Sequence, residues 1–164
     1  MVTWAMIKIG VISDTHLKQP DKRLGELLQG PFKDVDLIFH AGDITEIAVL
    51  NSLASKEVVA VCGNMDSPEV RRQLPKQRLI QLGGFRIGLI HGWGAPSGIE
   101  DRIKEEFSEI DCLIYGHTHA PAINRRGEIL FFNPGSFAGG LFSAKKSVGL
   151  LQIDKTIIGE IIYL

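Results

Sequence analysis

The chain has 164 residues, of which 45% are hydrophobic and 23% charged, and its formal net charge is −1. These values are ordinary for a globular protein, so we expect one domain over residues 1–164, with residues 1–5 as a flexible extension. The balanced charge excludes a general electrostatic attraction to nucleic acid or anionic membranes, and no apolar stretch approaches the ~18 residues of a membrane-spanning helix.

The first half of the chain alternates strand and helix patterns. Short apolar runs predict strands, and leucines at helical spacing predict helices. We expect, in chain order, a strand at 6–12, a helix at 21–29, a strand at 35–39, a helix at 44–55, a strand at 58–62 and a helix at 68–73.

The second half is richer in strands. Gly83-Gly84 indicates a hairpin between two of them. We expect strands at 78–82 and 85–90, a helix at 99–107, a strand at 112–115, and strand pairs at 122–125 with 129–132 and at 147–153 with 156–163. A βαβ pattern followed by hairpins predicts an α/β protein with two packed sheets and helices outside.

Two cysteines lie at the edges of apolar runs, Cys62 and Cys112. We expect buried free thiols rather than a disulfide, as in a reducing cytosol. The N-terminus lacks the basic, apolar and cleavage regions of a signal peptide, so we expect a cytoplasmic protein. The sequence leaves open whether translation starts at Met1 or Met6.

Seven side chains of the kinds that bind metals each follow one of the apolar runs. They are Asp14, His16, Asp43, Asn64, His91, His117 and His119. In α/β domains, sites form where strands end at their carboxyl edge. Seven nitrogen and oxygen donors exceed the needs of one metal ion and suit two ions that share a bridging carboxylate, which indicates hydrolytic chemistry.

The spacing of these residues has a physical reason. In an extended chain, residues i and i+2 project to the same side, so Asp14 with His16, and His117 with His119, could each hold one ion. Four of the five motifs place a glycine beside the donor, which allows the close approach that a crowded metal centre needs. Any one motif alone would more often be an ordinary turn, but all five together favour a metal centre.

In their order, the motifs Asp14-Thr15-His16, Gly42-Asp43, Gly63-Asn64, His91-Gly92 and Gly116-His117-Thr118-His119 resemble the calcineurin-like metallophosphoesterase family. The short chain and Asn133-Pro134-Gly135-Ser136 are similar to its small bacterial and archaeal phosphodiesterase branch, which also resembles the retromer scaffold subunit Vps29. The resemblance implies a four-layer αββα sandwich of two mixed β-sheets flanked by helices.

The resemblance also implies roles for the seven residues. One divalent ion would be held by Asp14, His16 and His119, and the other by Asn64, His91 and His117, with Asp43 bridging them. A bridging hydroxide would attack phosphorus, and Asp43, Asn64 and His117 would act in catalysis. Donors rich in histidine favour transition metals over magnesium. We expect two such ions, manganese first, with nickel, zinc, iron or cobalt as alternatives.

One position departs from the family pattern, in which the glycine and asparagine precede a histidine that is a candidate acid for the leaving group. Here Met65 follows Asn64 and cannot donate a proton. This puts efficient expulsion of poor leaving groups in doubt. Without that histidine as a partner, we expect Asp66 to orient the site or to cap the helix that begins at Pro68.

Other residues leave alternatives open. We prefer a structural role for His40 over support of a ligand, because its spacing does not make it one. The turn at 133–136 could support the site. The basic run Arg71, Arg72, Lys76 and Arg78 is more often a solvated face. Trp93 could wall a cleft and stack on a base, or lie in the core.

The leading hypothesis is therefore a metal-dependent phosphodiesterase that acts on a small phosphodiester. The alternatives are a phosphomonoesterase and, from a different class, a Vps29-like scaffold without catalysis. A scaffold would be expected to have lost ligands, and all seven are present. The family resemblance also suggests a homodimer or homotetramer.

Overall fold

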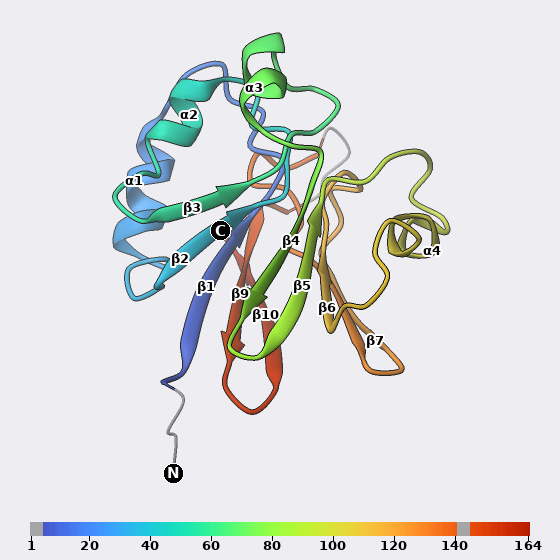
Figure 1. Ribbon diagram of the computed structural model, residues 1–164. Coiled ribbons are helices and arrows are strands. Elements are labelled where there is room, and N and C mark those ends of the chain that lie inside the picture. The colour runs from blue at the N-terminus through green and yellow to red at the C-terminus, as the bar shows by residue number, and fades with distance from the viewer. Residues whose placement is uncertain (1–4, 141–144) are drawn as a thin grey trace.

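The computed structural model describes residues 5–140 and 145–164, so the expected extension at 1–5, apart from its last residue, lies outside the described residues. The described residues form ten strands in two five-stranded sheets, together with four helices. Both sheets mix parallel and antiparallel neighbours (Figure 1).

The first sheet has the strand order β10-β9-β1-β2-β3. Strands β1, β2 and β3 run parallel, and β9 pairs antiparallel with both β1 and β10. The bounds of its strands are β1 Ile7–Ile12, β2 Leu37–His40, β3 Glu57–Ala60, β9 Ser147–Ile153 and β10 Ile157–Tyr163.

The second sheet has the order β4-β5-β6-β8-β7. Strands β5, β6 and β8 are parallel, while β4 and β7 are antiparallel edges. The bounds of its strands are β4 Gln77–Leu82, β5 Phe85–Ile90, β6 Cys112–Ile114, β7 Ala122–Arg126 and β8 Ile129–Asn133.

Alternation along the strands divides the apolar side chains among three clusters. Val11 of β1 and Phe132 of β8 lie in the cluster between the sheets, whereas their neighbours Ile12 and Phe131 lie in the two outer clusters. This is the period-two pattern of strands that are buried on both faces.

The outer clusters are closed by helices. Three of them cover the first sheet and one covers the second, so the expected four-layer αββα sandwich is confirmed (Figure 1). The bounds are α1 Lys22–Gln29, α2 Ile47–Asn51 and α3 Pro68–Gln73 on the first sheet, and α4 Ile99–Lys104 on the second.

Two expected helices were too long. The helix predicted at 44–55 spans only Ile47–Asn51. It begins late because Thr45 has a left-handed φ of 83° and donates its N–H to Asp66, and after Asn51 the chain continues in i→i+3 hydrogen bonds from Leu53 and Ala54. The helix predicted at 99–107 ends at Lys104. There the chain tightens into i→i+3 hydrogen bonds from Glu106 and Phe107. The start of α2 depends on a contact with Asp66, and the end of α4 depends on local hydrogen bonds; apolar spacing encodes neither.

The expected strands are correct in number and order, with ends displaced by one or two residues. The second and third strands begin and end at different residues than expected, at Leu37–His40 and Glu57–Ala60. Cys62 and Cys112 are buried and free, as predicted. Among the described residues, no helix has the length and apolarity to cross a membrane.

Candidate metal centre

The seven candidate ligands gather at one edge of the sandwich. Each follows the carboxyl end of a strand, namely β1, β2, β3, β5 or β6. The two sheets therefore present their parallel strand ends to a common space, as expected for α/β sites. The structure brings together donors that are up to 105 positions apart in the chain, from Asp14 to His119.

A first cluster consists of Asp14, His16 and His119. The Nε2 atoms of the two histidines are 3.2 Å apart, and Asp14 Oδ1 lies 3.2 Å from His119 Nε2 and 3.6 Å from His16 Nε2. Donor atoms this close could bind one ion together. These are the three residues that the family resemblance groups at one ion.

A second cluster joins Asp14, Asp43 and His91. Asp43 Oδ2 lies 3.3 Å from His91 Nε2 and 3.7 Å from His16 Nε2, so it stands between the two clusters. Asp14 Oδ1 is also 4.0 Å from His91 Nε2. Both carboxylates thus lie within reach of both clusters, whereas the sequence singled out only Asp43 as shared.

Asn64 and His117 extend the second cluster. Asn64 Oδ1 lies 3.1 Å from His91 Nε2 and 3.2 Å from His117 Nδ1. His117 and His119 therefore belong to different clusters, and the idea that their spacing would let them hold one ion is wrong. The chain does not continue as a strand here, so the alternation rule does not apply.

The rings of His91 and His117 each lie between a backbone carbonyl and the side chain of Asn64. The carbonyl of Ala41 lies 2.7 Å from His91 Nδ1, and that of Gly94 lies 2.9 Å from His117 Nε2. Carbonyls only accept, so these nitrogens carry the protons. The other nitrogen of each ring faces the side-chain amide of Asn64. A metal ion between these groups would receive a lone pair from each of them, and imidazoles anchored by a carbonyl are typical of metal ligands.

In Asp14 and in Asp43, one carboxylate oxygen accepts hydrogen bonds from the protein and the other lies beside histidine nitrogens. Asp14 Oδ2 accepts from the Ser13 hydroxyl at 2.7 Å and from the His117 backbone at 3.2 Å, and Asp43 Oδ1 accepts from the Met65 backbone at 2.8 Å. Asp14 Oδ1 is buried and makes no regular hydrogen bond, and its polar neighbours are the ring nitrogens of His119 and His16. A buried carboxylate oxygen without a regular hydrogen bond is costly unless a cation binds it, so the donor set fits a metal ion.

Strained backbone is concentrated at the same place. Left-handed φ angles between 46° and 68° occur at five of the seven candidates, which are Asp14, His16, Asp43, His117 and His119. Thr45 is the remaining described residue other than glycine with a positive φ. Such conformations cost ~1–3 kcal/mol each and persist where the surroundings enforce them, commonly at functional sites. The extended geometry that the sequence suggested for Asp14 and His16 is wrong, although both side chains still face one centre.

The titration of the carboxylates reflects this crowding. Burial raises the pKa of Asp14, but the contacts with His119 and His16 outweigh it, so its pKa lies well below the ordinary value of 3.8. Burial also raises the pKa of Asp43, yet the contact with His91 leaves it lowered overall. Both groups therefore carry negative charge in the centre at neutral pH.

The pKa values of His91 and His119 shift upward, in contrast to those of the carboxylates. The contact with Asp14 raises the pKa of His119. Burial lowers the pKa of His91, but the contact with Asp43 raises it overall. In the protein without metal, the carboxylates therefore favour protonation of these two rings. Metal ions and protons must therefore compete for the same donors.

His40 lies beneath the centre and has a structural position, as preferred from the sequence. It is fully buried, and burial lowers its pKa to about 3, so the ring is neutral. Its Nδ1 accepts from the Gly42 N–H at 3.2 Å, and its Nε2 lies 3.3 Å from the Thr15 hydroxyl. It thereby ties together the loops that carry Asp14 and Asp43.

The turn at 133–136 contacts both ligand loops. Asn133 Nδ2 donates to the Gly116 carbonyl and to the Thr118 hydroxyl, each at 3.0 Å, and the Ser136 hydroxyl donates to the Asp14 carbonyl at 3.1 Å. These bonds agree with the supporting role that the sequence left open.

The structure also gives the positions of Asp66 and Trp93, for which the sequence left two alternatives each. Asp66 is not the cap of α3, because Ser67 accepts from the Val70 N–H. Asp66 instead accepts from the Thr45 and Gly63 N–H groups, each at 2.6 Å, which agrees with an orienting role. Trp93 is 43% exposed, so its placement in the core is wrong.

Sequence reasoning missed several parts of this centre. The Ser13 hydroxyl and the carbonyls of Ala41 and Gly94 bind candidate ligands, as described above. Arg102 of α4 donates to the carbonyls of Trp93 and Ser97 at 3.0 and 2.9 Å and also contacts that of Ala95. Carbonyls carry no residue-type signature, and Arg102 belongs to none of the motifs, so no local signal marks them.

Comparison with known proteins identifies the family of the chain. Residues 7–156 match the family model described as calcineurin-like phosphoesterase superfamily domain. A probable metallophosphoesterase of Methanothermobacter thermautotrophicus is 40% identical over 131 residues, which cover 78% of this chain and 76% of the relative. The phosphodiesterase YfcE of Escherichia coli is 38% identical over 113 residues, covering 64% of this chain and 57% of the relative.

Among solved structures, vacuolar protein sorting 29 from Cryptosporidium parvum superposes with a TM-score of 0.80 at 24% identity, covering 97% of this chain and 92% of that one. At this identity the likeness shows a shared fold.

Proposed function

The chain belongs to the calcineurin-like phosphoesterase superfamily, and we propose that it hydrolyses small phosphodiesters with two divalent metal ions bound by the seven candidate ligands. Its metallophosphoesterase and phosphodiesterase relatives make it a phosphoric ester hydrolase. The diester preference, the second ion and the ligand set are our proposal.

One observation carries the proposal. The oxygens of Asp14, Asp43 and Asn64 converge with the ring nitrogens of the histidines, and Asp14 Oδ1 is buried with only such ring nitrogens beside it. Within a protein such an arrangement is stable only around positive charge. Two separable clusters, one with His16 and His119 and one with Asn64, His91 and His117, support two ions rather than one.

When bound, the ions would lower the pKa of a coordinated water and stabilise negative charge on the phosphoryl oxygens. The chain contributes geometry. Ser13, Met65 and the carbonyls of Ala41 and Gly94 hold the donors in place, so little reorganisation is needed on binding. Two carboxylates against two divalent ions leave the centre positive, which suits a phosphodiester anion.

The donor types favour the metals proposed from the sequence. Four imidazoles among seven donors are unsuited to magnesium, which prefers oxygen ligands and retains its water. We propose manganese, with nickel, zinc, iron and cobalt as ions that the same donors would accept.

The test compares the hydrolysis rates of a diester and a monoester that release the same leaving group, p-nitrophenolate. Metal-free protein loaded with manganese is assayed on bis(p-nitrophenyl) phosphate and on p-nitrophenyl phosphate. We expect hydrolysis of the diester to exceed that of the monoester and to vanish with chelation. His16→Ala removes one candidate ligand whose side chain is partly exposed, so it should lower activity while the protein stays folded. Preference for the monoester would overturn the diester proposal.

The scaffold alternative draws its support from the shared fold with vacuolar protein sorting 29. It predicts a folded protein that binds little metal and has no diesterase activity under any of the metals named. The retained donors argue against it. The expected homodimer or homotetramer stays a prediction, which analytical ultracentrifugation of the metal-loaded protein would test.

A further inference from the structure

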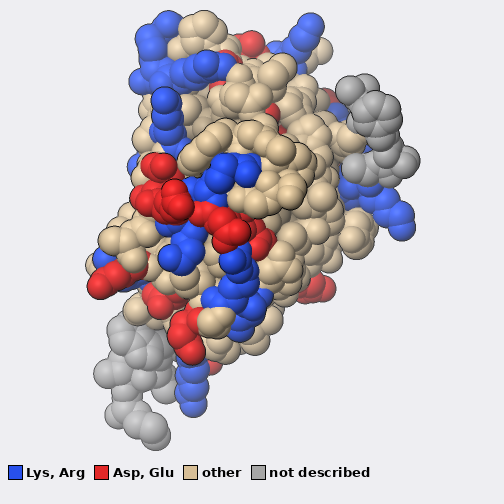
Figure 2. Space-filling view, turned by 90° about the vertical axis from the view of Figure 1, so that its right-hand side faces the viewer, with Lys and Arg blue, Asp and Glu red and all other residues tan. Residues whose placement is uncertain are grey.

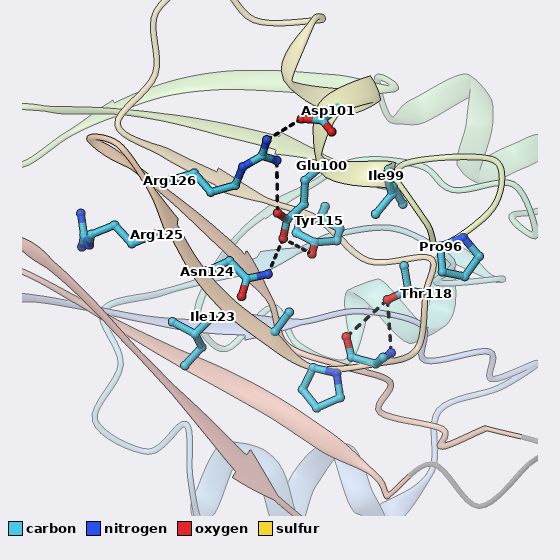
Figure 3. A pocket seen from close by; sticks show the side chains of 14 residues that line it. Pro96, Ile99, Glu100, Asp101, Tyr115, Thr118, Ile123, Asn124, Arg125 and Arg126 are labelled. Atoms are coloured by element: carbon cyan, nitrogen blue, oxygen red, sulfur yellow. Dashed lines mark hydrogen bonds and ion pairs between the residues drawn. The ribbon is translucent and has the colours of Figure 1, made fainter.

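One cavity with a volume of about 730 Å³ is not the best candidate for a substrate site. It lies between α4 and β7, on a face where acidic and basic side chains gather (Figure 2). Glu100 accepts from Tyr115 and Asn124 at 2.8 and 2.7 Å, and Arg126 pairs with Glu100 and Asp101 (Figure 3). These charges satisfy one another, so nothing there calls for a ligand.

A second groove opens directly beside the candidate metal centre. It has a volume of about 630 Å³, and Asn64 and His91 form part of its wall. Leu74, Pro75 and Ile90 supply apolar surface. Its size is that of a pocket for a small organic molecule. A substituent on a phosphate bound at the centre would have this groove within reach.

Trp93 lines the same groove and remains 43% exposed. An indole is usually buried or paired with a partner, because it has a large apolar area. Its backbone is fixed at the same time, since Arg102 donates to the carbonyls of Trp93 and Ser97. The ring is thus held at the groove by an anchored loop and presents a preformed stacking surface.

The cations of the groove differ in availability. The guanidinium of Arg71 is already bound to the carbonyls of Asp66 and Asn64. Lys76 forms no ion pair with a carboxylate among the described residues, so its ammonium can donate to a ligand. The exposed Trp93, the apolar surface and the ammonium of Lys76 suit a planar ring that carries hydrogen-bond acceptors.

Resting on the proposed function, we propose that this groove binds a nucleobase, and that the substrates are phosphodiesters of a nucleoside. Trp93 stacks on the base, the apolar wall of Leu74 and Pro75 excludes water, and Lys76 donates to a ring carbonyl. An alkyl chain would use the apolar wall but would gain nothing from an exposed indole face or from Lys76. Stacking on aromatic residues tolerates different bases, so the groove selects the class rather than one base.

The experiment compares two diesters that release the same p-nitrophenolate. These are thymidine 5′-(p-nitrophenyl phosphate) and methyl p-nitrophenyl phosphate, assayed on manganese-loaded protein. The wild type should favour the nucleoside ester in kcat/KM by about tenfold or more, within the range that stacking of one base supplies. Trp93→Leu should remove this preference while hydrolysis of the methyl ester stays within about twofold. Trp93→Phe should retain part of it.

Calorimetry supplies a readout apart from turnover. Thymidine 5′-monophosphate should bind the loaded protein about tenfold more tightly than methyl phosphate, and Trp93→Leu should abolish the difference. Leu79→Ala, which truncates a half-exposed side chain on β4, is the matched control and should change nothing.

The outcomes separate the two proposals. Equal rates for both diesters in the wild type, or an equal loss on both in Trp93→Leu, would overturn the nucleobase assignment and leave the diesterase intact. A higher rate on glycerol p-nitrophenyl phosphate with a long acyl chain would assign the groove to lipid instead. Failure to hydrolyse even the methyl ester, together with equal binding of both phosphates, would reject both.

Discussion

Met65 donates its backbone N–H to Asp43 Oδ1 at 2.8 Å, while 59% of the residue is exposed. The main chain at this position thus holds the carboxylate that stands between the two clusters, and the side chain is free. A thioether cannot donate a proton, so position 65 offers orientation without acid catalysis.

This predicts a steep dependence of rate on the leaving group. General acids contribute ~10²–10⁴-fold to such reactions, and without one the leaving oxygen departs with more charge. Aryl diesters should be cleaved readily and alkyl diesters poorly. Met65→His should flatten the dependence if the ring reaches the leaving oxygen. The measurement is kcat/KM over a series of phosphodiesters with alcohols of increasing basicity, under saturating manganese.

Met65→Leu is the control, since it keeps the backbone bond and adds no acid. A shallow dependence in the wild type would show that another group donates the proton. His40 could not be that group, because it is fully buried and its two nitrogens contact Gly42 and Thr15.

Asp43→Asn should weaken both metal sites together. The substitution keeps the shape and removes the negative charge that lies 3.3 Å from His91 and 3.7 Å from His16. We expect a loss of at least roughly tenfold in affinity at each site, comparable to other perturbations of ligand shells. Elemental analysis and calorimetric titration with manganese measure both sites.

Asp101→Asn, an exposed carboxylate on α4, is the matched control and should retain full binding. If the wild type binds at most one ion per chain at saturation, the two-ion model fails. If Asp43→Asn loses only one ion and holds the other normally, Asp43 does not bridge.

Gly63→Ala should damage the centre through packing alone. A Cβ at this position would overlap Asp43 Oδ1 and lie 2.5 Å from the Asp43 backbone nitrogen. Overpacking of this kind costs ~1–3 kcal/mol of unfolding free energy. Since Asp43 must shift, manganese affinity should fall too. Thermal unfolding and metal titration measure the two effects.

Gly25→Ala provides the contrast. Gly25 lies within α1, and a Cβ there meets nothing within 4 Å. Alanine should stabilise the helix by up to ~1 kcal/mol without changing metal affinity. Wild-type stability and metal binding in Gly63→Ala would show that the space beside Asp43 is not restricted.

The sequence could predict the sandwich and the place of the ligands for one reason. Each donor follows an apolar run, and strands in such a fold end at a common edge. The pairing of donors could not be read from spacing. His117 and His119 are two residues apart, yet left-handed φ angles of 68° and 59° send them to different clusters.

The missing details are contacts between side chains and loops that are not neighbours in the sequence. The start of α2 depends on the bond from Thr45 to Asp66, and the loop of Trp93 depends on Arg102. These partners are recognised only after the chain has folded, because local propensity is silent about them. The lengths of α2 and α4 therefore escaped prediction, and the choice between cleft and core stayed open for Trp93, while the apolar layers were predicted.

The buried His40 should make stability depend on pH in a definite direction. Burial lowers its pKa to about 3 in the folded protein, against 6.5 when unfolded. The unfolded chain thus binds the proton first, and His40 costs stability as pH falls below 6.5 until the folded form is protonated near 3. Each pH unit in that window is worth up to ~1.4 kcal/mol.

His91 and His119 act with the opposite sign, because their pKa values are raised in the folded state. Their stabilisation is fully present below 6.5 and is lost as pH rises through the raised values. The pH profile of the metal-free wild type therefore mixes opposing contributions, and a difference between two variants is needed to isolate His40.

His40→Gln removes the titrating group and keeps an acceptor and a donor for Gly42 and Thr15. We expect the variant to be less stable than the wild type at alkaline pH, because its side chain fills the buried site less well. The difference in unfolding free energy should shrink by up to ~1.4 kcal/mol for each pH unit below 6.5, since only the wild type must keep a histidine neutral. Urea unfolding of both metal-free proteins at a series of pH values measures this difference. A difference that stays constant across the window would mean that His40 takes up its proton equally in the folded and unfolded states, and that the ring is not sealed from solvent beneath the centre.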